Sequence, residues 1–288
     1  RDPDSLHARM VATFTRWAAM LMAKQFIAGG NAAEAIESVQ RFRRRQMGFT
    51  LDVLGEYTSS ESQAEKYKHT YLDLIESLCP AAREWREVSR IDTNSAGTMP
   101  RVNISIKLTA LSPHFDAIDP RQAIRSVSDR LRPILRRARE LGAFINIDME
   151  SFAYRDITIE LFTQLLSEDE FRDMTDIGIV VQAYLRDGEN DYDRLLRWVR
   201  KRGFPIEVRL VKGAYWDMET AMAVQNNTPA PVWLHKWESD ACYERISRTM
   251  LENHRFIRPA FASHNVRSLA AVIATAEEFG LSAADYEI

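Results

Sequence analysis

The sequence predicts an α/β fold, a closed (βα)8 barrel of the TIM-like kind, and three observations lead to this prediction. Short β-rich runs alternate with segments of helical periodicity along most of the 288 residues, as in a parallel sheet whose strands are joined by crossover helices. The sequence has no Gly-x-Gly-x-x-Gly run, which makes a dinucleotide-binding sheet the weaker interpretation. A barrel of roughly 250 residues commonly forms a single domain, so the length is also suitable.

Six segments have the composition and length of buried strands. The last residues, Tyr286 to Ile288, resemble the start of a seventh strand. Six and a half strands would leave unpaired edges, so we expect a C-terminally incomplete barrel that lacks at least one strand and its helix. The six predicted strands are residues 49–54, 102–108, 143–149, 177–184, 206–211 and 257–262.

Helical periodicity between these runs predicts the crossover helices. The clearest helix begins with Asp119 as its cap and Pro120 as its first residue, and it ends at Gly142. A second helix has Ser60 and Gln63 in capping-box register. The apolar faces are Ile124, Val127, Leu131, Leu135, Ala138 and Leu141; Tyr67, Tyr71, Leu74, Ile75 and Leu78; Tyr192, Leu195, Leu196 and Val199 before Gly203; and Leu269, Ile273 and Ala276 before Gly280.

Residues 1–46 are predicted to be a helical arm, and residues 47–288 the barrel. The chain starts without an initiator Met or a signal-peptide pattern, so we expect it to be a piece of a longer protein. Residues 17–27 are apolar but too short and too charged to span a bilayer, which favours a docking helix. A basic run at Arg41 and Arg43 to Arg45 is interpreted as a solvated helix face, with a membrane-surface role as the alternative.

Composition excludes several function classes. A formal net charge of −3 and a pI near 6.1 leave no basic surplus for phosphates, so we expect no nucleic-acid contact from this segment. Cys79 and Cys242 are the only cysteines. They form no Cys-x-x-Cys pair, so no disulfide framework or zinc site is predicted, and a reducing compartment fits best.

Polar residues occupy one parity of four predicted strands. Both faces of a helix-covered barrel strand are buried, so continuous apolar runs are the norm, and the alternation places the polar parity inside the barrel. The charged members come late in their strands, at the C-terminal mouth where barrel enzymes hold their active sites. A structural ion-pair network is the alternative. The polar parity consists of Asn103, Ser105 and Lys107; Asn146, Asp148 and Glu150; Gln182; and Glu207 and Arg209.

Residues 209–216 read Arg-Leu-Val-Lys-Gly-Ala-Tyr-Trp. Gly213 would end a strand and let backbone approach a ligand closely. Arg209 and Lys212 suit an anionic or electron-rich partner, and Tyr215 and Trp216 offer flat surfaces to an aromatic ring. A strand end with a buried aromatic pair is the structural alternative.

This octapeptide resembles the most characteristic motif of the proline dehydrogenase family, and five further motifs follow the family's order. The match runs from about residue 49 to the end and is most similar to the bifunctional bacterial form called proline utilization A. The other motifs are Asp52 to Glu56, Ser105 to Leu108 with Ala110 and Leu111, Asn146 to Glu150, Val180 to Tyr184, and Phe261 to Asn265.

The resemblance implies a distorted barrel that binds FAD, oxidises L-proline to Δ1-pyrroline-5-carboxylate and passes the electrons to a membrane quinone. It implies a cytoplasmic protein peripherally associated with the inner membrane, and an aldehyde dehydrogenase half as a potential partner in the full-length protein. Lys107, Asp148 and Tyr215 are implied at the proline site, and Arg209, Asp148 and Lys107 as catalytic. The implied FAD contacts are Met149, Gln182, Arg209, Lys212, Gly213, Ala214, Trp216, Ser239, Ser263, His264 and Asn265.

Two departures from the family pattern stand out. Leu234 replaces a Thr on the diphosphate side, and Ser239 replaces the Thr before Asp240. The family's carboxylate-binding arginine pair lies after the eighth strand, beyond Ile288. The rival hypotheses are another barrel flavoenzyme of the methylenetetrahydrofolate reductase type, a Schiff-base aldolase that uses Lys107, and a non-enzymatic DNA-binding or scaffold piece.

Overall fold

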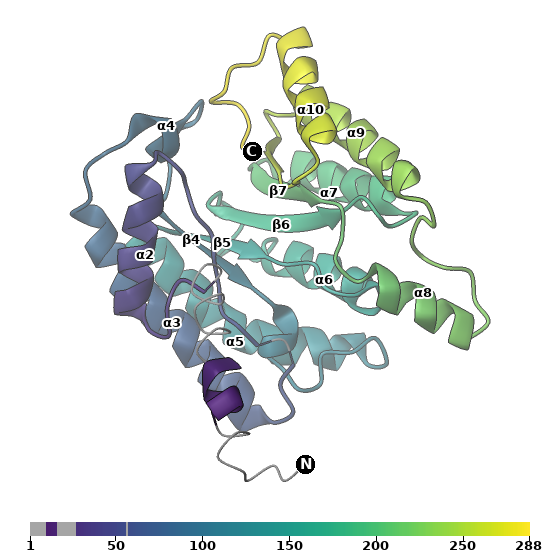
Figure 1. The fold of residues 1–288 in the computed structure, drawn as a ribbon, viewed down its shortest axis with the longest axis horizontal. Coiled ribbons are helices and arrows are strands. Elements are labelled where there is room, and N and C mark those ends of the chain that lie inside the picture. The colour runs from purple at the N-terminus through teal and green to yellow at the C-terminus, as the bar shows by residue number, and fades with distance from the viewer. Residues whose placement is uncertain (1–9, 16–26, 56) are drawn as a thin grey trace.

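In the computed structural model, which describes residues 10–15, 27–55 and 57–288, six parallel strands form one sheet at the centre of the molecule (Figure 1). The α/β barrel-type fold is as predicted, and each predicted run supplies one strand. The sheet order is β1-β4-β5-β6-β7-β8. The strands are β1 (Leu51–Asp52), β4 (Val102–Ile106), β5 (Ala143–Ile147), β6 (Ile177–Gln182), β7 (Ile206–Val211) and β8 (Ile257–Phe261).

Several strands end earlier than the sequence suggests. Pairing stops at Ile106 and Ile147, so Lys107 and Asp148 lie just beyond their strands. The first strand keeps only two of its six predicted residues. A small antiparallel pair, β2 (Thr93–Asn94) and β3 (Gly97–Thr98), was not predicted.

Helices surround the sheet (Figure 1). The predicted start and end signals are confirmed: the side chain of Asp119 accepts a hydrogen bond from the Gln122 amide, and that of Ser60 from the Gln63 amide. Gly142 ends its helix with a φ of 76°, which favours glycine. The helices are α2 (Ala32–Arg44), α3 (Glu61–Arg83), α4 (Ser89–Asp92), α5 (Pro120–Leu141), α6 (Phe152–Leu165), α7 (Gly188–Arg202), α8 (Trp216–Gln225), α9 (Lys236–Glu252) and α10 (Val266–Glu278), with the 3-10 turn η1 (Leu108–Ala110).

The face of α10 differs from the prediction. Ser268, Val272 and Ala276 are the buried residues of this helix, whereas Ile273 is 41% exposed. The helix is therefore rotated by about one position relative to the face that its apolar residues suggest.

The last residues pair with β8. The Glu287 amide donates to the Pro259 carbonyl (2.9 Å), and the Phe261 amide donates to the Glu287 carbonyl (2.9 Å). This parallel bridge between Ala260 and Glu287 is where the sequence predicts the start of a seventh strand.

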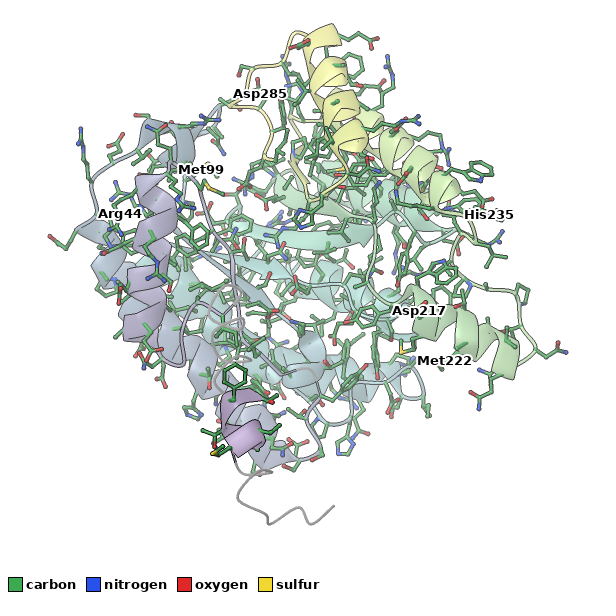
Figure 2. All side chains as sticks on the ribbon, viewed as in Figure 1. Arg44, Met99, Asp217, Met222, His235 and Asp285 are labelled. Carbon is green, nitrogen blue, oxygen red and sulfur yellow. The ribbon has the colours of Figure 1, made fainter. Side chains whose placement is uncertain are left out.

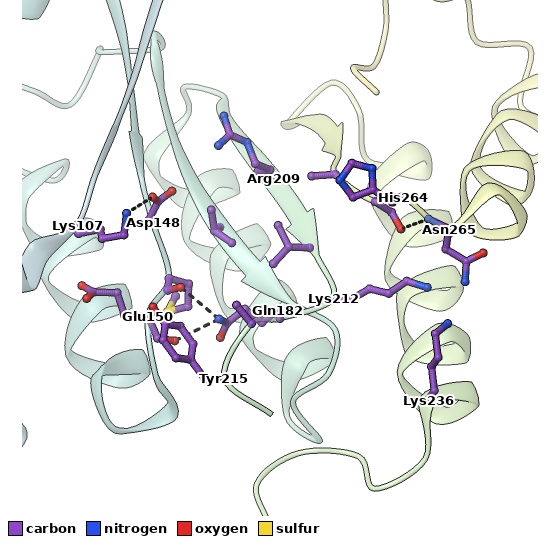
Figure 3. A pocket seen from close by; sticks show the side chains of 17 residues that line it. Lys107, Asp148, Glu150, Gln182, Arg209, Lys212, Tyr215, Lys236, His264 and Asn265 are labelled. Carbon is purple, nitrogen blue, oxygen red and sulfur yellow. Dashed lines mark hydrogen bonds and ion pairs between the residues drawn. The ribbon is translucent and has the colours of Figure 1, made fainter. Parts of the chain in front are cut away.

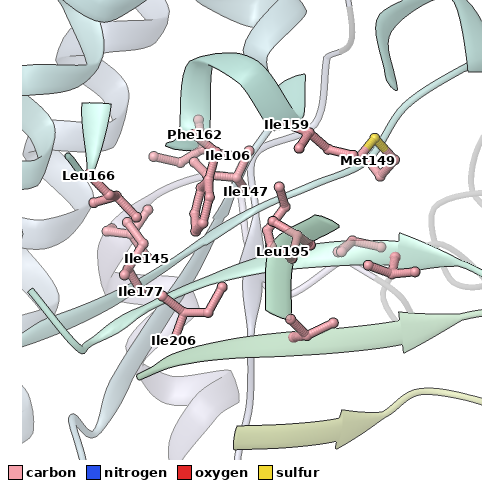
Figure 4. Packing of buried hydrophobic residues seen from close by; sticks show 14 of the residues in the cluster. Ile106, Ile145, Ile147, Met149, Ile159, Phe162, Leu166, Ile177, Leu195 and Ile206 are labelled. Carbon is pink, nitrogen blue, oxygen red and sulfur yellow. The ribbon is translucent and has the colours of Figure 1, made fainter. Parts of the chain in front are cut away.

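The two faces of the strands have opposite character, as predicted. Ile104, Ile106, Ile145 and Ile147 are at most 1% exposed and pack with Phe162 and Leu166 of the α6 region (Figure 4). The other face carries a row of residues in register across all six strands, polar on five of them, which we call the polar row: Asp52, Ser105, Asn146, Gly178, Glu207 and Arg258. In-register neighbours point to the same face, so the polar row lies on the inside.

The part of the arm that is described packs through α2 against α3. Its basic run is only partly a solvated face. Arg44 is exposed at the outer edge of α2 (Figure 2), but Arg43 is buried and donates two hydrogen bonds of 2.8 Å to the Asp92 carboxylate. The interpretation of a solvated face is therefore wrong for Arg43. Residues 17–26 of the docking helix lie outside the described residues, and the boundary at residues 46 and 47 stays a prediction.

Replacing Asp92 with alanine should destabilise the fold by about 3–5 kcal/mol, because Arg43 would keep a buried charge without its partner. Urea unfolding at neutral pH measures this. Asp129→Ala removes an exposed ion pair with Arg132 and is the control, with an expected cost of about 0–1 kcal/mol.

The contribution of Asp92 to the stability of the fold should also depend on pH. Burial opposes ionisation, but hydrogen bonds from Arg43 and the Val88 amide, with the charges of Arg43 and Arg101, leave the Asp92 pKa below its ordinary value of 3.8. The stability from Asp92 is thus fully present above pH 3.8 and is lost as the pH falls through the lowered pKa. A difference between the two proteins that stays constant into strong acid would contradict the assignment.

Candidate active site

A cavity of about 800 Å³ opens at the carboxyl ends of the strands (Figure 3). It is large enough for a cofactor with a small substrate. Twelve of the fourteen predicted site residues line it: Lys107, Asp148, Met149, Gln182, Arg209, Lys212, Gly213, Ala214, Tyr215, Ser263, His264 and Asn265.

One end of the cavity holds a cluster of charged groups around Asp148. The Lys107 ammonium contacts the Asp52 carboxylate and lies 3.9 Å from Asp148 Oδ2 (Figure 3). Asp148 Oδ1 accepts hydrogen bonds from Ser105 Oγ and Asn146 Nδ2, both at 3.0 Å. Burial raises the pKa of Asp148 above its ordinary value, against these bonds and the positive charges. A carboxylate so placed can hold a cationic amine and accept a proton from it.

Arg209 lies on the inner face of β7, next to this cluster. Its Nη1 donates to Ser105 Oγ (3.4 Å) and its Nη2 to Thr50 Oγ1 (3.0 Å). Both partners are neutral hydroxyls, and no described carboxylate forms an ion pair with Arg209. Its charge is therefore available to an anionic group in the cavity.

Gln182 joins the cavity wall to the chain that follows β5. Its Nε2 donates to the Met149 and Glu150 carbonyls, each at 3.2 Å (Figure 3). Its Oε1 is buried and has no hydrogen-bond partner within the described chain. A buried acceptor on a cavity wall is expected to meet a donor from a ligand or water.

Glu150 lines the cavity but was not among the predicted site residues. Its carboxylate accepts hydrogen bonds from the Thr109 amide (3.2 Å) and the Thr109 hydroxyl (2.5 Å). Burial raises the Glu150 pKa to about 7, against these two bonds and the charge of Lys107. Glu150 alternates along the chain with the same parity as Asn146 and Asp148, and this pattern could have predicted from the sequence that it faces the cavity.

The far end of the cavity is cationic. Lys212 and Lys236 both form ion pairs with Asp240, and Lys212 also donates to Ser268 Oγ (2.9 Å). Burial of Asp240 opposes ionisation, but hydrogen bonds from both lysines leave its pKa below the ordinary value. The helices α9 and α10 begin here, and helix N-termini favour anions. Lys236 lines the cavity but, like Glu150, was not among the predicted site residues.

The segment between β7 and α8 is shaped by Gly213. Its φ of +124° is one that side chains rarely adopt, and a Cβ atom there would lie 2.3 Å from the Tyr184 ring. The sequence predicted that the backbone at Gly213 lies close to a ligand; in the structure it lies close to the ring of Tyr184. The backbone amide of Tyr184 also donates to the Lys212 carbonyl (2.7 Å).

Two predicted cofactor residues do not line the cavity. Trp216 is 41% exposed at the start of α8, and its Nε1 donates to the Trp233 carbonyl (2.8 Å). Ser239 is buried within α9. The family resemblance alone supported Ser239, whereas Trp216 was also expected to offer a flat surface to an aromatic ring.

Among the described residues, no group of three or more His, Cys, Asp or Glu side chains is arranged to hold a metal ion. No helix in the described part of the chain has both the length and the apolar character needed to cross a membrane.

Comparisons with known proteins identify relatives along most of the chain. A family model described as "Proline dehydrogenase" matches residues 35–288. The chain is 30% identical to "Bifunctional protein PutA" of Escherichia coli (strain K12) over 253 residues, or 88% of this chain and 18% of that protein. It is 28% identical to "Proline dehydrogenase 1" of Bacillus subtilis (strain 168), covering 68% of this chain and 53% of the relative.

The comparison with solved structures also finds PutA proteins. The crystal structure of proline utilization A (PutA) from Bdellovibrio bacteriovorus, inactivated by N-propargylglycine, matches with a TM-score of 0.94 and 44% identity. The match covers 96% of this chain and 29% of that one. A Bradyrhizobium japonicum PutA mutant, D778Y, matches with a TM-score of 0.78 and 27% identity, over 96% of this chain and 27% of that one. The chain thus spans about a fifth of the E. coli PutA protein and about half of the B. subtilis enzyme.

Proposed function

The chain belongs to the proline dehydrogenase family, and we propose that it oxidises L-proline to Δ1-pyrroline-5-carboxylate by hydride transfer to FAD. The observation that carries the proposal is the cavity, which brings Lys107, Asp148 and Arg209 together from three different strands. A small zwitterion needs an anionic partner for its amine, and Asp148 offers one at this end of the cavity.

Three features support FAD as the cofactor. The buried Gln182 Oε1 lacks a donor among the described residues, and a flavin ring carries an N–H group that can supply one. Arg209 donates to two hydroxyls and forms no ion pair within the described part of the chain, so it can stabilise negative charge on a reduced ring. The cationic end at Lys212 and Lys236 suits a diphosphate. When bound, FAD supplies the hydride acceptor.

The residues of the chain bind and orient the substrate. Hydride leaves the carbon beside the proline nitrogen, which requires the amine to be neutral. We assign Asp148 to hold the amine and receive its proton, since burial already raises the Asp148 pKa. Lys107 lies 3.9 Å from Asp148 Oδ2 and keeps this carboxylate in place. Tyr215 closes the same part of the cavity, and Met149, Gly213, Ala214, Ser263, His264 and Asn265 complete the cofactor wall.

The proposal extends to the redox partner and the location. Electrons pass from the reduced cofactor to a membrane quinone, which requires a cytoplasmic protein peripherally associated with the inner membrane. The PutA relatives are named bifunctional, so we include an aldehyde dehydrogenase half as the further partner that receives the product.

The test is the visible spectrum of the full-length protein that contains residues 1–288. We expect a yellow protein whose flavin absorbance is bleached by L-proline without oxygen, and turnover with an artificial electron acceptor. The extracted cofactor should run as FAD on chromatography, because the cationic end at Lys212 and Lys236 suits the diphosphate that FAD has and FMN lacks.

Other outcomes separate the rival functions. A flavin that proline does not bleach would contradict the substrate and favour a flavoenzyme of the methylenetetrahydrofolate reductase type. A colourless protein that borohydride traps on a carbonyl substrate would favour the Schiff-base aldolase. A shift of DNA mobility at physiological salt would favour the DNA-binding piece.

A further inference from the structure

The polar row has a gap at its centre, between Asn146 and Glu207. Gly178 sits between them in register and contributes no side chain. A Cβ atom at Gly178 would lie 3.1 Å from Asn146 Oδ1 and 3.2 Å from Glu207 Cβ. The amide oxygen and the Glu207 side chain therefore border the same small space.

If Glu207 is ionised, the polar atoms that border this space cannot form hydrogen bonds with one another. Asn146 Nδ2 already donates to Asp148 Oδ1 (3.0 Å) and Ser105 Oγ (3.3 Å). Asn146 Oδ1 and Glu207 Oε1 are both buried, and neither has a partner among the described residues. Two buried acceptors without a donor are costly. One proton on Glu207 would turn an acceptor into the missing donor.

The charges that face Glu207 come from four places. Arg209 is on its own strand, Arg258 on β8, Asp176 before β6, and Glu287 on the terminal segment. Arg258 is held by Asp176 and the Thr175 carbonyl, and Arg209 by two hydroxyls. Burial, with the charge of Glu287, raises the Glu207 pKa to about 8, and the two arginines only partly oppose this.

We propose that Glu207 is a neutral carboxylic acid that donates a hydrogen bond, direct or through one water, to Asn146 Oδ1, and that it is thereby a positioning residue for Asp148. The bond fixes the Asn146 amide with its nitrogen toward Asp148 and Ser105. Asp148 Oδ1 then always meets two donors and keeps one orientation. The positioning role rests on the proposed function, in which Asp148 holds the proline amine; the hydrogen bond itself does not.

The first experiment needs no substrate. Infrared difference spectra of the full-length protein, wild type minus Glu207→Gln, should contain a protonated carboxylic acid C=O band at pH 7. That band should disappear with a midpoint near pH 8. In Asn146→Ala the band should move to higher frequency, because its hydrogen-bond partner is gone. An absent band at pH 7, or a band indifferent to Asn146→Ala, overturns the proposal.

The second experiment measures proline oxidation with the cofactor bound. Glu207→Gln keeps a donor and should stay within about twofold of wild type in kcat/KM at pH 7. Glu207→Met has no donor and should lose about tenfold, as expected for one lost hydrogen bond. The wild-type rate should fall as the pH passes about 8, and Glu207→Gln should lack this fall. A Glu207→Met protein as active as wild type, or a Glu207→Gln protein as poor as Glu207→Met, overturns the positioning role.

The two experiments fail separately. If the infrared band passes both tests but the protein does not oxidise proline, the proposed function is wrong and the Glu207 hydrogen bond stands. If proline is oxidised but the band is missing, the function stands and this inference is wrong.

Discussion

Replacing Arg209 with methionine should slow the reduction of flavin by proline by about 100- to 1000-fold, the usual cost of removing one fixed group that stabilises developing charge. Arg209 is suited to this role because its guanidinium donates to the hydroxyls of Ser105 and Thr50 and pairs with no carboxylate of the described residues. Its charge acts on the nearby carboxylates of Asp148 and Glu207, but neither forms an ion pair with it, so it would also stabilise a reduced, anionic flavin.

The same change should lower the flavin reduction potential by tens of millivolts, since about 30 mV in a two-electron couple corresponds to roughly 1.4 kcal/mol. Anaerobic rapid-mixing spectra give the rate, and a redox titration gives the potential. Arg258→Met is the matched control, because Arg258 lies on the same inner face, one strand away, but does not line the cavity. An unchanged potential in Arg209→Met would mean that the arginine serves the barrel structure instead.

Replacing Gly213 with alanine should destabilise the protein by about 2–6 kcal/mol and empty the cofactor site. The φ of +124° strains any side chain there, at a cost of about 1–3 kcal/mol. The added methyl would also lie 2.3 Å from the Tyr184 ring, and such overpacking costs about 1–3 kcal/mol. Relief requires the segment from Lys212 to Tyr215 to move, and this segment lines the cavity.

Flavin content per chain and the thermal midpoint measure the two effects. Gly280→Ala is the control, because Gly280 has a φ of +70° with nothing within 4 Å of its Cβ position. It should cost only about 1–2 kcal/mol, the strain of a left-handed backbone without a clash, and keep its flavin. Tyr184 is itself buried, so Tyr184→Ala carries its own cost; if the ring clash contributes, the double variant should cost less than the sum of the two single changes. Full flavin content in Gly213→Ala alone would show that this turn does not shape the site.

The features that could be predicted from the sequence are those set by the chemistry of neighbouring residues. Asp119, Pro120 and Gly142 bound a helix because capping groups and a left-handed glycine act over a few residues. The polar parity of the strands identified the inner face, since the alternation of side chains in a strand is a backbone property. Most of the predicted site residues line the cavity because the C-terminal ends of parallel strands meet at one mouth.

Contacts between residues that lie far apart in the sequence could not be predicted in the same way. The partner of Arg43 is Asp92, 49 residues away, so its burial could not be inferred from a basic run. Gly178 leaves a gap beside Glu207 only because three strands align in one particular register. Trp216 and Ser239 were assigned by resemblance, and their positions in α8 and α9 depend on how those helices dock. In each case the deciding contact joins distant parts of the chain.

The shared carboxylate at the cationic end has a consequence for handling the protein. Asp240 pairs with both Lys212 and Lys236, and Asn265 Nδ2 also donates to it (3.3 Å). One anion against two cations leaves a single uncompensated positive charge, and Lys236 is 74% exposed. Mobile ions screen such a charge over about 8 Å at physiological ionic strength. A phosphate-bearing molecule held there is therefore retained better in dilute buffer than in concentrated salt, so the choice of elution salt during purification decides how much of it survives.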